Sequence, residues 1–152
     1  MERKDQDMVT VKIQLLNEDA EMPTPAHEGD AGFDVRAMES VEIAPGGTVL
    51  VGTGIAMEIP HGYEAQMRPR SGMAYKRGIS LANTPGTIDS GYRGEVKAAL
   101  HNISVNEMAY VEKGDRIAQI VINKLPEVKL VEVDELSETS RADGGFGSTG
   151  VR

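Results

Sequence analysis

The sequence lacks cysteine and tryptophan, and it holds only two phenylalanines and four tyrosines among its 152 residues. Without cysteine there is no disulfide framework, no thiolate metal site and no thiol nucleophile. With so few aromatic rings, the core must consist of aliphatic side chains and methionine. A chain of this length buries about two-thirds of its unfolded surface, so a single domain needs no disulfide or metal to fold.

Long apolar runs are also missing. No stretch approaches the roughly 18 apolar residues that cross a membrane, and residues 1–10 are polar, unlike the apolar core of a signal peptide. We expect a soluble, cytoplasmic protein with no membrane partner.

Positive charge is scarce, since 16 Lys and Arg face 24 Asp and Glu and the net charge is −8. This argues against a nucleic-acid partner, which would require a basic surface and stacking aromatics. Residues 65–88 are the exception, because they carry Arg68, Arg70, Lys76 and Arg77 and no carboxylate. This window is either a local anion site or a solvated basic face, and charge alone favours the solvated face.

Seventeen glycines and seven prolines interrupt the sequence too often for long helices. Apolar and polar residues alternate in short blocks, which is the period of half-buried strands in a sandwich or barrel. A single short helix is predicted at residues 71–77, with Ser71 as its N-cap. The predicted strands are residues 9–15, 41–43, 48–59, 63–67, 79–83, 96–100, 108–112, 116–124 and 128–136.

No internal repeat or linker divides the chain. We predict one domain over residues 1–138 and a flexible tail over residues 139–152, which hold four glycines. Gly145 and Gly150 have the spacing of a phosphate loop, but the Lys and Ser/Thr of that motif do not follow. The tail is either a disordered terminus or a glycine-rich lid that closes over phosphates.

Two further segments carry chemistry. In residues 68–74, an arginine pair followed by Ser71 and Gly72 at a helix start could bind phosphate, or could form a capped turn with surface arginines. Residues 83–95 have turn signals at both ends and predict a β-hairpin, whose backbone groups could pair with a pyrimidine edge. Within it, Asp89 is a general base or a turn former, and Tyr92 is a sugar platform or an ordinary strand aromatic.

Five segments taken in order decide between these alternatives. Residues 31–35, 68–74, 86–95, 114–119 and 141–150 resemble the five motifs of the homotrimeric deoxyuridine triphosphate nucleotidohydrolases, the dUTPases. The resemblance runs from about Val9 to the C-terminus. It implies a jelly-roll-like distorted β-barrel, a homotrimer with active sites between subunits, and Mg²⁺ as cofactor. The implied reaction hydrolyses dUTP to dUMP and pyrophosphate, which keeps uracil out of DNA and supplies dUMP for dTMP synthesis.

The resemblance also implies roles for single residues. Asp89 would deprotonate the water that attacks the α-phosphorus, with Gln119 near that water and Ser71 near the leaving oxygen. Arg141 would act as an arginine finger from the tail. Mg²⁺ would be held mainly by substrate phosphates and waters, with Asp34 supporting this polar network.

The implied substrate contacts fall into four groups. They are Arg70, Ser71 and Gly72 on the phosphates; Asn83, Gly86, Thr87, Ile88 and Asp89 around uracil; Tyr92, Lys97 and Gln119 on the sugar and the rest of the nucleotide; and Arg141, Phe146, Gly147, Ser148 and Thr149 in the closing tail. Phe146 would stack on uracil, and Gly147 to Thr149 would wrap the γ-phosphate.

Two alternatives to this reading stay open at the level of sequence. One is a dCTP deaminase of the same fold, although such enzymes generally lack the tail motif at residues 141–150. The other is a noncatalytic jelly-roll binding domain, which gives no reason for Asp89, Gln119 and Arg141 to occur together.

Overall fold

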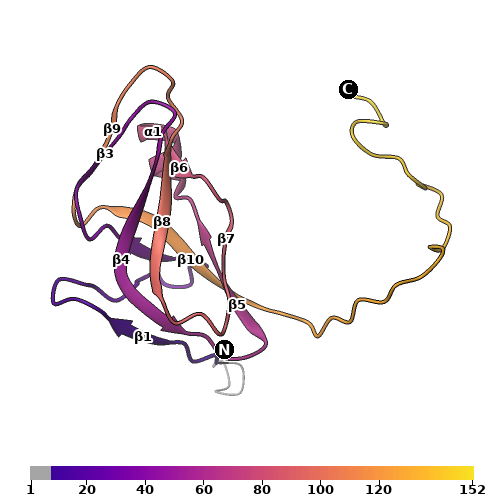
Figure 1. Ribbon diagram of the computed structural model, residues 1–152, viewed down its shortest axis with the longest axis horizontal. Coiled ribbons are helices and arrows are strands. Elements are labelled where there is room, and N and C mark those ends of the chain that lie inside the picture. The colour runs from indigo at the N-terminus through magenta and orange to yellow at the C-terminus, as the bar shows by residue number, and fades with distance from the viewer. Residues whose placement is uncertain (1–7) are drawn as a thin grey trace.

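The computed structural model describes residues 8–152, so most of the polar start on which the signal-peptide prediction rests lies outside it. Within the described range the chain forms ten strands and one short helix (Figure 1). The predicted all-β class is confirmed. The elements are β1 (Lys12–Leu15), β2 (Phe33–Arg36), β3 (Val41–Ile43), β4 (Thr48–Glu58), β5 (Tyr63–Arg68), α1 (Ser71–Arg77), β6 (Ile79–Leu81), β7 (Gly86–Ile88), β8 (Glu95–Asn102), β9 (Ala109–Val111) and β10 (Arg116–Lys124).

The strands form two larger antiparallel sheets and one small one. Their orders are β1-β4-β8-β6, β2-β10-β5-β7 and β3-β9. The jelly-roll-like arrangement agrees with the prediction, but the sheets keep open edges and do not close into a barrel. One of these edges, β7, becomes important for the site.

Side chains from both larger sheets meet in one aliphatic core. Val51 and Leu100 of the first sheet pack in the same cluster as Ala65 and Ile120 of the second. Among residues 8–152, no Phe or Tyr belongs to the buried set, and Tyr63 only packs against its edge. The predicted core without aromatics is therefore confirmed.

A bulge interrupts the long β4–β8 pair. The pairing runs as far as Gly52 opposite Lys97 and resumes with Ala56 opposite Glu95, so three residues of β4 face a single residue of β8. The Thr53 hydroxyl donates to the Val96 carbonyl across this gap (2.5 Å). Bulges bend a strand and re-aim the side chains beside them. This one lies opposite the start of β8, where the site begins.

Helix α1 begins at Ser71, and its N-cap residue is Arg70, which keeps an extended backbone conformation and makes no side-chain cap hydrogen bond. The predicted Ser71 N-cap is therefore wrong by one position. Gly78 ends the helix in the left-handed conformation that glycine tolerates (φ 64°). Arg77 then ties the last turn to the rest of the fold, because it donates to Asp115 Oδ2 (3.0 Å) and to the Tyr110 carbonyl.

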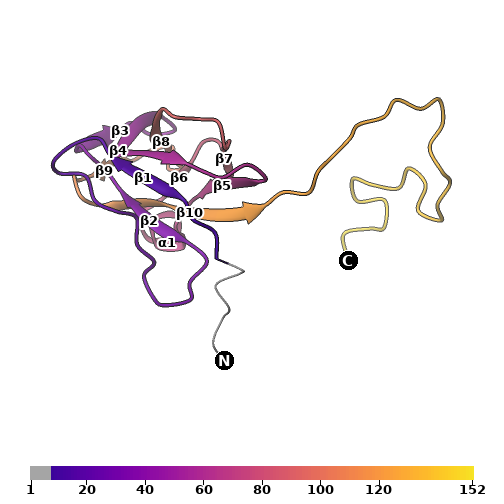
Figure 2. The same cartoon turned by 90° about the horizontal axis from the view of Figure 1, so that it is seen from below.

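Two further predictions of local structure are wrong, and one strand was missed. Residues 128–136 form no strand, because the chain leaves the sheets after β10 and no strand within residues 8–152 lies beside it (Figure 2). Residues 83–95 are not a hairpin, because β7 pairs with β5 whereas β8 pairs with β4 and β6, so this segment crosses from one sheet to the other. Residues 33–36, which are not among the predicted strands, form β2 beside β10.

Candidate active site

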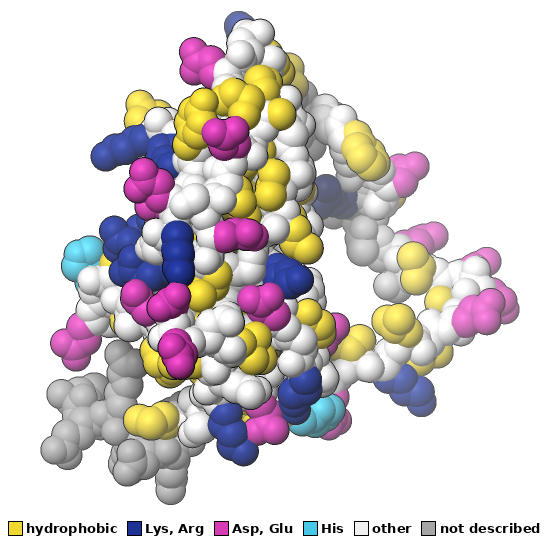
Figure 3. Space-filling model, turned by 60° about the vertical axis from the view of Figure 1, so that its left-hand side comes forward, with side chains coloured by type: hydrophobic (Ala, Val, Ile, Leu, Met, Phe, Trp, Pro, Cys, Tyr) yellow, Lys and Arg dark blue, Asp and Glu magenta, His cyan; other side chains and the backbone are white. Residues whose placement is uncertain are grey.

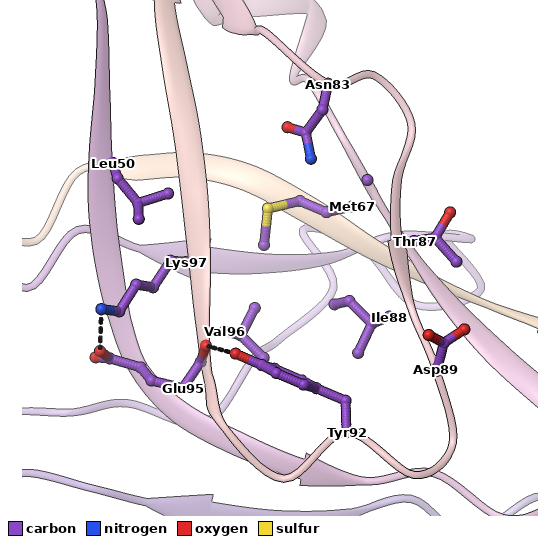
Figure 4. Close-up of a pocket in the computed structure, with 11 residues that line it drawn as sticks. Leu50, Met67, Asn83, Thr87, Ile88, Asp89, Tyr92, Glu95, Val96 and Lys97 are labelled. Atoms are coloured by element: carbon purple, nitrogen blue, oxygen red, sulfur yellow. Dashed lines mark hydrogen bonds and ion pairs between the residues drawn. The ribbon is translucent and has the colours of Figure 1, made fainter.

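A cavity of about 310 Å³ opens where the crossing segment leaves one sheet for the other (Figure 4). It brings together most of the residues predicted to contact the nucleoside. Strands β5 and β7 form one side and β4 and β8 form the other. The lining residues are Leu50, Met67, Asn83, Gly86, Thr87, Ile88, Asp89, Tyr92, Glu95, Val96 and Lys97.

The wall formed by β7 is the edge of its sheet. β7 is the last strand of its sheet, pairing with β5 through Gly86 opposite Met67 and Ile88 opposite Ala65. An edge strand has one row of backbone N–H and C=O groups that its own sheet leaves unpaired. Since Gly86, Thr87 and Ile88 line the cavity, this row is available to a planar partner with complementary donors and acceptors.

Tyr92 and Asp89 are positioned by the turn that follows β7. The Tyr92 amide donates to the Asp89 carbonyl (3.1 Å), and the Tyr92 hydroxyl donates to the Glu95 carbonyl (3.0 Å). These contacts hold the ring across the cavity floor, between Ile88 and Val96, with Asn83 on the opposite side (Figure 4). The Asp89 carboxylate is exposed at the rim, where it is open to water.

A second group of predicted residues lies where β2, β10 and the start of α1 meet. Asp34 accepts from Arg70 Nε (3.1 Å) and Arg116 Nη1 (3.5 Å), and its side chain is only 9% exposed. Arg70 also donates to the Arg116 carbonyl (3.3 Å). The guanidinium groups of Arg70 and Arg116 together outweigh the single charge of Asp34. The net positive charge beside exposed Ser71 favours binding of an anion.

Gln119 belongs to this second group. Its amide donates to the Pro69 carbonyl (3.0 Å), so β10 is linked to the turn that carries Arg70. A Cβ on Gly32 would lie 2.1 Å from Gln119 Oε1, and glycine at that position is what gives the Gln119 side chain its space. Gly72 lies next to Ser71 on the exposed first turn of α1.

The tail forms a third, separate group. Figures 1 and 2 show that the chain after β10 runs away from the sheets and curls on itself. Arg141 Nε donates to the Gly144 carbonyl within the tail (2.9 Å), and Phe146 is fully exposed. The predicted site residues of the tail therefore lie together and apart from the other two groups. They are Arg141, Phe146, Gly147, Ser148 and Thr149.

The cation-rich window does not form one anion site. Arg70 reaches Asp34, Arg77 anchors α1 through Asp115, and Arg68 donates to the Gln66 side chain (2.9 Å). On the face drawn in Figure 3, Lys and Arg side chains stand in small groups with Asp and Glu among them. Of the four window cations, Arg70 is the one whose side chain bonds to a predicted site residue, Asp34, whereas Arg68 lies opposite Gln119 in the β5–β10 pair.

Sequence reasoning missed several residues that shape these groups. Leu50 and Met67 line the cavity although they lie in strands distant from the motifs, and no local signal marks them. Glu95 and Arg116 stand inside quoted motifs and could have been singled out as charged residues there. Gly32 could have been recognised only through its contact with Gln119.

Asp115 shows how the surroundings of the second group are fixed. Burial raises the pKa of its carboxyl, but hydrogen bonds from the Glu112 amide and from Arg77 outweigh that effect, and the pKa is lowered from its usual value. The ionised form is thus the one the fold stabilises.

Residues 8–152 contain neither a cluster of metal ligands nor a membrane-spanning helix. No three His, Asp or Glu side chains lie close enough together to hold a metal ion. None of the described helical structure is long and apolar enough to span a bilayer.

Comparison with known proteins identifies the family. The sequence matches the dUTPase family model over residues 18–150. The deoxyuridine 5'-triphosphate nucleotidohydrolase of Alkaliphilus metalliredigens is 52% identical over 145 residues, covering 95% of this chain and 100% of the relative. The protein of that name from Clostridioides difficile is 50% identical over 143 residues, covering 94% and 99%.

Solved structures agree. The dUTPase of Staphylococcus bacteriophage 80alpha, determined with dUpNHpp, matches with a TM-score of 0.85 and 31% identity over 93% of this chain and 99% of that one. A dUTPase variant from phage phi11 of S. aureus matches with a TM-score of 0.75 and 28% identity over 83% and 97%. With its five motifs distributed over this fold as described, the chain belongs to the dUTPase family.

Proposed function

We propose that this protein hydrolyses dUTP to dUMP and pyrophosphate. The observation that carries the proposal is the cavity in which Asn83, edge strand β7, Asp89 and Tyr92 converge. The bacterial relatives are named for this reaction, and the phage relative was solved with a dUTP analogue.

Uracil would be recognised by the backbone groups of edge strand β7. Its N3–H and carbonyl oxygens complement backbone C=O and N–H groups of Gly86 to Asp89, and the Asn83 amide supplies a further donor and acceptor. Tyr92 would pack under the deoxyribose, where its ring leaves no room for a ribose hydroxyl. Lys97 completes the cavity at the far wall.

The chemistry needs a base, charge neutralisation and exclusion of water. Asp89 would take the proton of the water that attacks the α-phosphorus, and the bond from that phosphorus to the α–β bridging oxygen would break as pyrophosphate leaves. Arg70, Ser71 and Gly72 would bind the phosphates, with Gln119 beside the α-phosphate. Arg141 would add positive charge while Phe146 stacks on the base and residues 147–149 cover the γ-phosphate.

We propose a homotrimer in which these parts come from different copies of the chain. The nucleoside cavity, the Asp34–Arg70–Gln119 group and the tail are separate within one chain. The segment between β10 and the tail also exposes apolar side chains that a neighbouring copy could cover. They are Leu125, Val128, Leu130, Val131, Val133 and Leu136.

Mg²⁺ would enter with the triphosphate. The described residues offer no cluster of metal ligands of their own, and both Asp34 oxygens face arginines. We therefore propose that the ion is bound by phosphate oxygens and waters and supplies neutralisation of phosphate charge. The phi11 relative is described as coordinating a structural Mg(II) ion.

We further propose that residues 1–138 act as the β domain and residues 139–152 as its lid. We also propose a cytoplasmic location and no nucleic-acid partner, since a net charge of −8 disfavours binding to a polyanion.

Product analysis tests the proposal. The protein is incubated with Mg²⁺ and either dUTP or dCTP, and pyrophosphate, dUMP and ammonia are measured. We expect pyrophosphate and dUMP from dUTP and no ammonia from dCTP. Ammonia release would instead favour the deaminase, and nucleotide binding without any product would favour a noncatalytic domain.

A further inference from the structure

Glu95 lies at the point where the β4 bulge meets the nucleoside cavity, and three contacts converge on it. Its Oε1 accepts from the Gly54 amide inside the bulge (3.1 Å). Its Oε2 lies 3.9 Å from Lys97 Nζ, and its backbone carbonyl accepts the Tyr92 hydroxyl (3.0 Å). Figure 4 shows Tyr92 and Lys97 both directed to this one residue.

The β4 bulge leaves space for the Glu95 carboxylate beside Gly52. A Cβ on Gly52 would lie 2.7 Å from Glu95 Oε1, so residue 52 must lack a side chain for the carboxylate to reach the Gly54 amide. The Glu95 side chain is 27% exposed, which screens its pairing with Lys97 less than at an open surface. The carboxylate is therefore held on one side by backbone and holds the lysine on the other.

We infer that Glu95 is a positioning residue for the nucleotide: it orders the Lys97 side chain at the cavity wall while its backbone fixes Tyr92. This rests on the proposed function. A lysine stem has several rotatable bonds, and ordering it before binding removes part of the entropy cost of contact with the ligand. Because Glu95 neutralises the ammonium charge, Lys97 is suited to an uncharged acceptor on the base or sugar rather than to the triphosphate.

The test compares Glu95→Gln and Glu95→Ala. Glutamine keeps an oxygen for the Gly54 amide but loses the ion pair, so its thermal stability stays near wild type. We expect the KM for dUTP to rise about threefold, in line with the usual strength of such pairs, with little change in kcat because binding is lost equally in ground and transition states. Alanine loses both contacts, and its melting temperature should fall as well.

Two further variants assign the effect. In a Lys97→Met background, Glu95→Gln should no longer change KM, since the partner through which it acts is gone. Glu42→Gln makes the same chemical change at the exposed position of strand β3 and should leave KM unaltered. The dissociation constant for dUpNHpp is measured alongside, because it does not depend on turnover.

The inference is overturned if Glu95→Gln changes neither the KM for dUTP nor the dissociation constant for dUpNHpp. It is also overturned if Glu95→Gln raises KM equally in the wild-type and the Lys97→Met backgrounds. Tighter dUTP binding in Glu95→Gln also overturns it, since a released Lys97 would then be acting on phosphate. A wild-type protein that binds dUpNHpp but releases no product from dUTP refutes the proposed function, while the dissociation constants still decide the role of Glu95.

Discussion

The Gln119 side chain fits in its position only because residue 32 is glycine. Its amide bonds to the Pro69 carbonyl and links β10 to the turn that carries Arg70. Asp89, in contrast, is exposed on the connection between two sheets. Gln119 is therefore tested by crowding its side chain, and Asp89 by removing the charge of its carboxylate.

Gly32→Ala should displace Gln119, because the new Cβ would lie 2.1 Å from Gln119 Oε1. A misplaced catalytic group costs about 10²-fold in rate, so we expect kcat for dUTP to fall by that order. Steady-state kinetics with circular dichroism as the folding control checks this. If kcat is unchanged in the folded variant, Gln119 has no part in the reaction.

Asp89→Asn should remove the base while keeping the size of the side chain. Loss of a general base costs about 10²–10⁴-fold, and dUpNHpp binding should remain close to wild type. Rapid-quench measurement of dUMP formation and calorimetric binding check the two halves. Asp19→Asn, an exposed aspartate outside the cavity, serves as the matched control. Near-normal turnover in Asp89→Asn would exclude Asp89 as the base.

At the scale of elements, α1 is too short to be stable by itself and is held by contacts at its ends. Arg77 links its last turn to Asp115, and Met73 is its buried residue. The tail has no such contacts with the sheets and carries its own turns. The helix is therefore tied to the sheets, and we expect the tail to be separable from them.

Asp115→Asn should destabilise the protein at neutral pH and not in acid. The carboxyl pKa is lowered in the folded state, so its stabilisation is present above the unfolded pKa and is lost as pH falls through the folded pKa. We expect a melting temperature about 3 °C below wild type at pH 7, corresponding to about 1 kcal/mol. The difference should begin to shrink below about pH 4 and vanish only below the lowered pKa of the folded protein. A gap that persists in thermal melts at acid pH would contradict this account.

Deletion of residues 139–152 should leave the strands and the thermal stability intact but lower dUTP turnover by about 10³-fold, as removal of an arginine finger does. Circular dichroism measures the first two properties, as a spectrum and as a thermal melt, and product release measures the third. Arg141→Ala in the full chain separates the contribution of charge from that of the rest of the lid. A truncated protein with full activity would rule out a lid.

At the scale of the whole molecule, the separation of the three residue groups predicts complementation between copies. Asp89→Asn chains and chains without residues 139–152 should each be inactive alone. Refolded together, they should recover part of the activity, because mixed assemblies contain sites with an intact cavity from one copy and an intact tail from another. Sedimentation of the mixture confirms that hybrids form. If the hybrids are inactive, each site is built from one chain.

The five motifs could be placed from sequence, and so could the aliphatic core, the short helix and most strands, because strand periodicity and turn residues are local properties. Strand partners could not. The alternation in residues 128–136 suits a strand, but a strand needs a neighbour, and the part of the chain that the structure describes provides none. Residues 83–95 have the turn residues of a hairpin, yet buried Ile88 and Val96 pack from opposite sheets.

The sequence by itself therefore determined the family, the fold class and the identities of Asn83, Asp89, Tyr92 and Gln119 as candidate residues, since motif order and spacing are carried by the chain. Tertiary structure decided which of them meet. It made β7 an edge strand facing the cavity, joined Arg70 to Asp34 and opened space for Glu95 and Gln119 at two glycines. These contacts join residues far apart in the chain, so they arise from packing and have no local signal in the sequence.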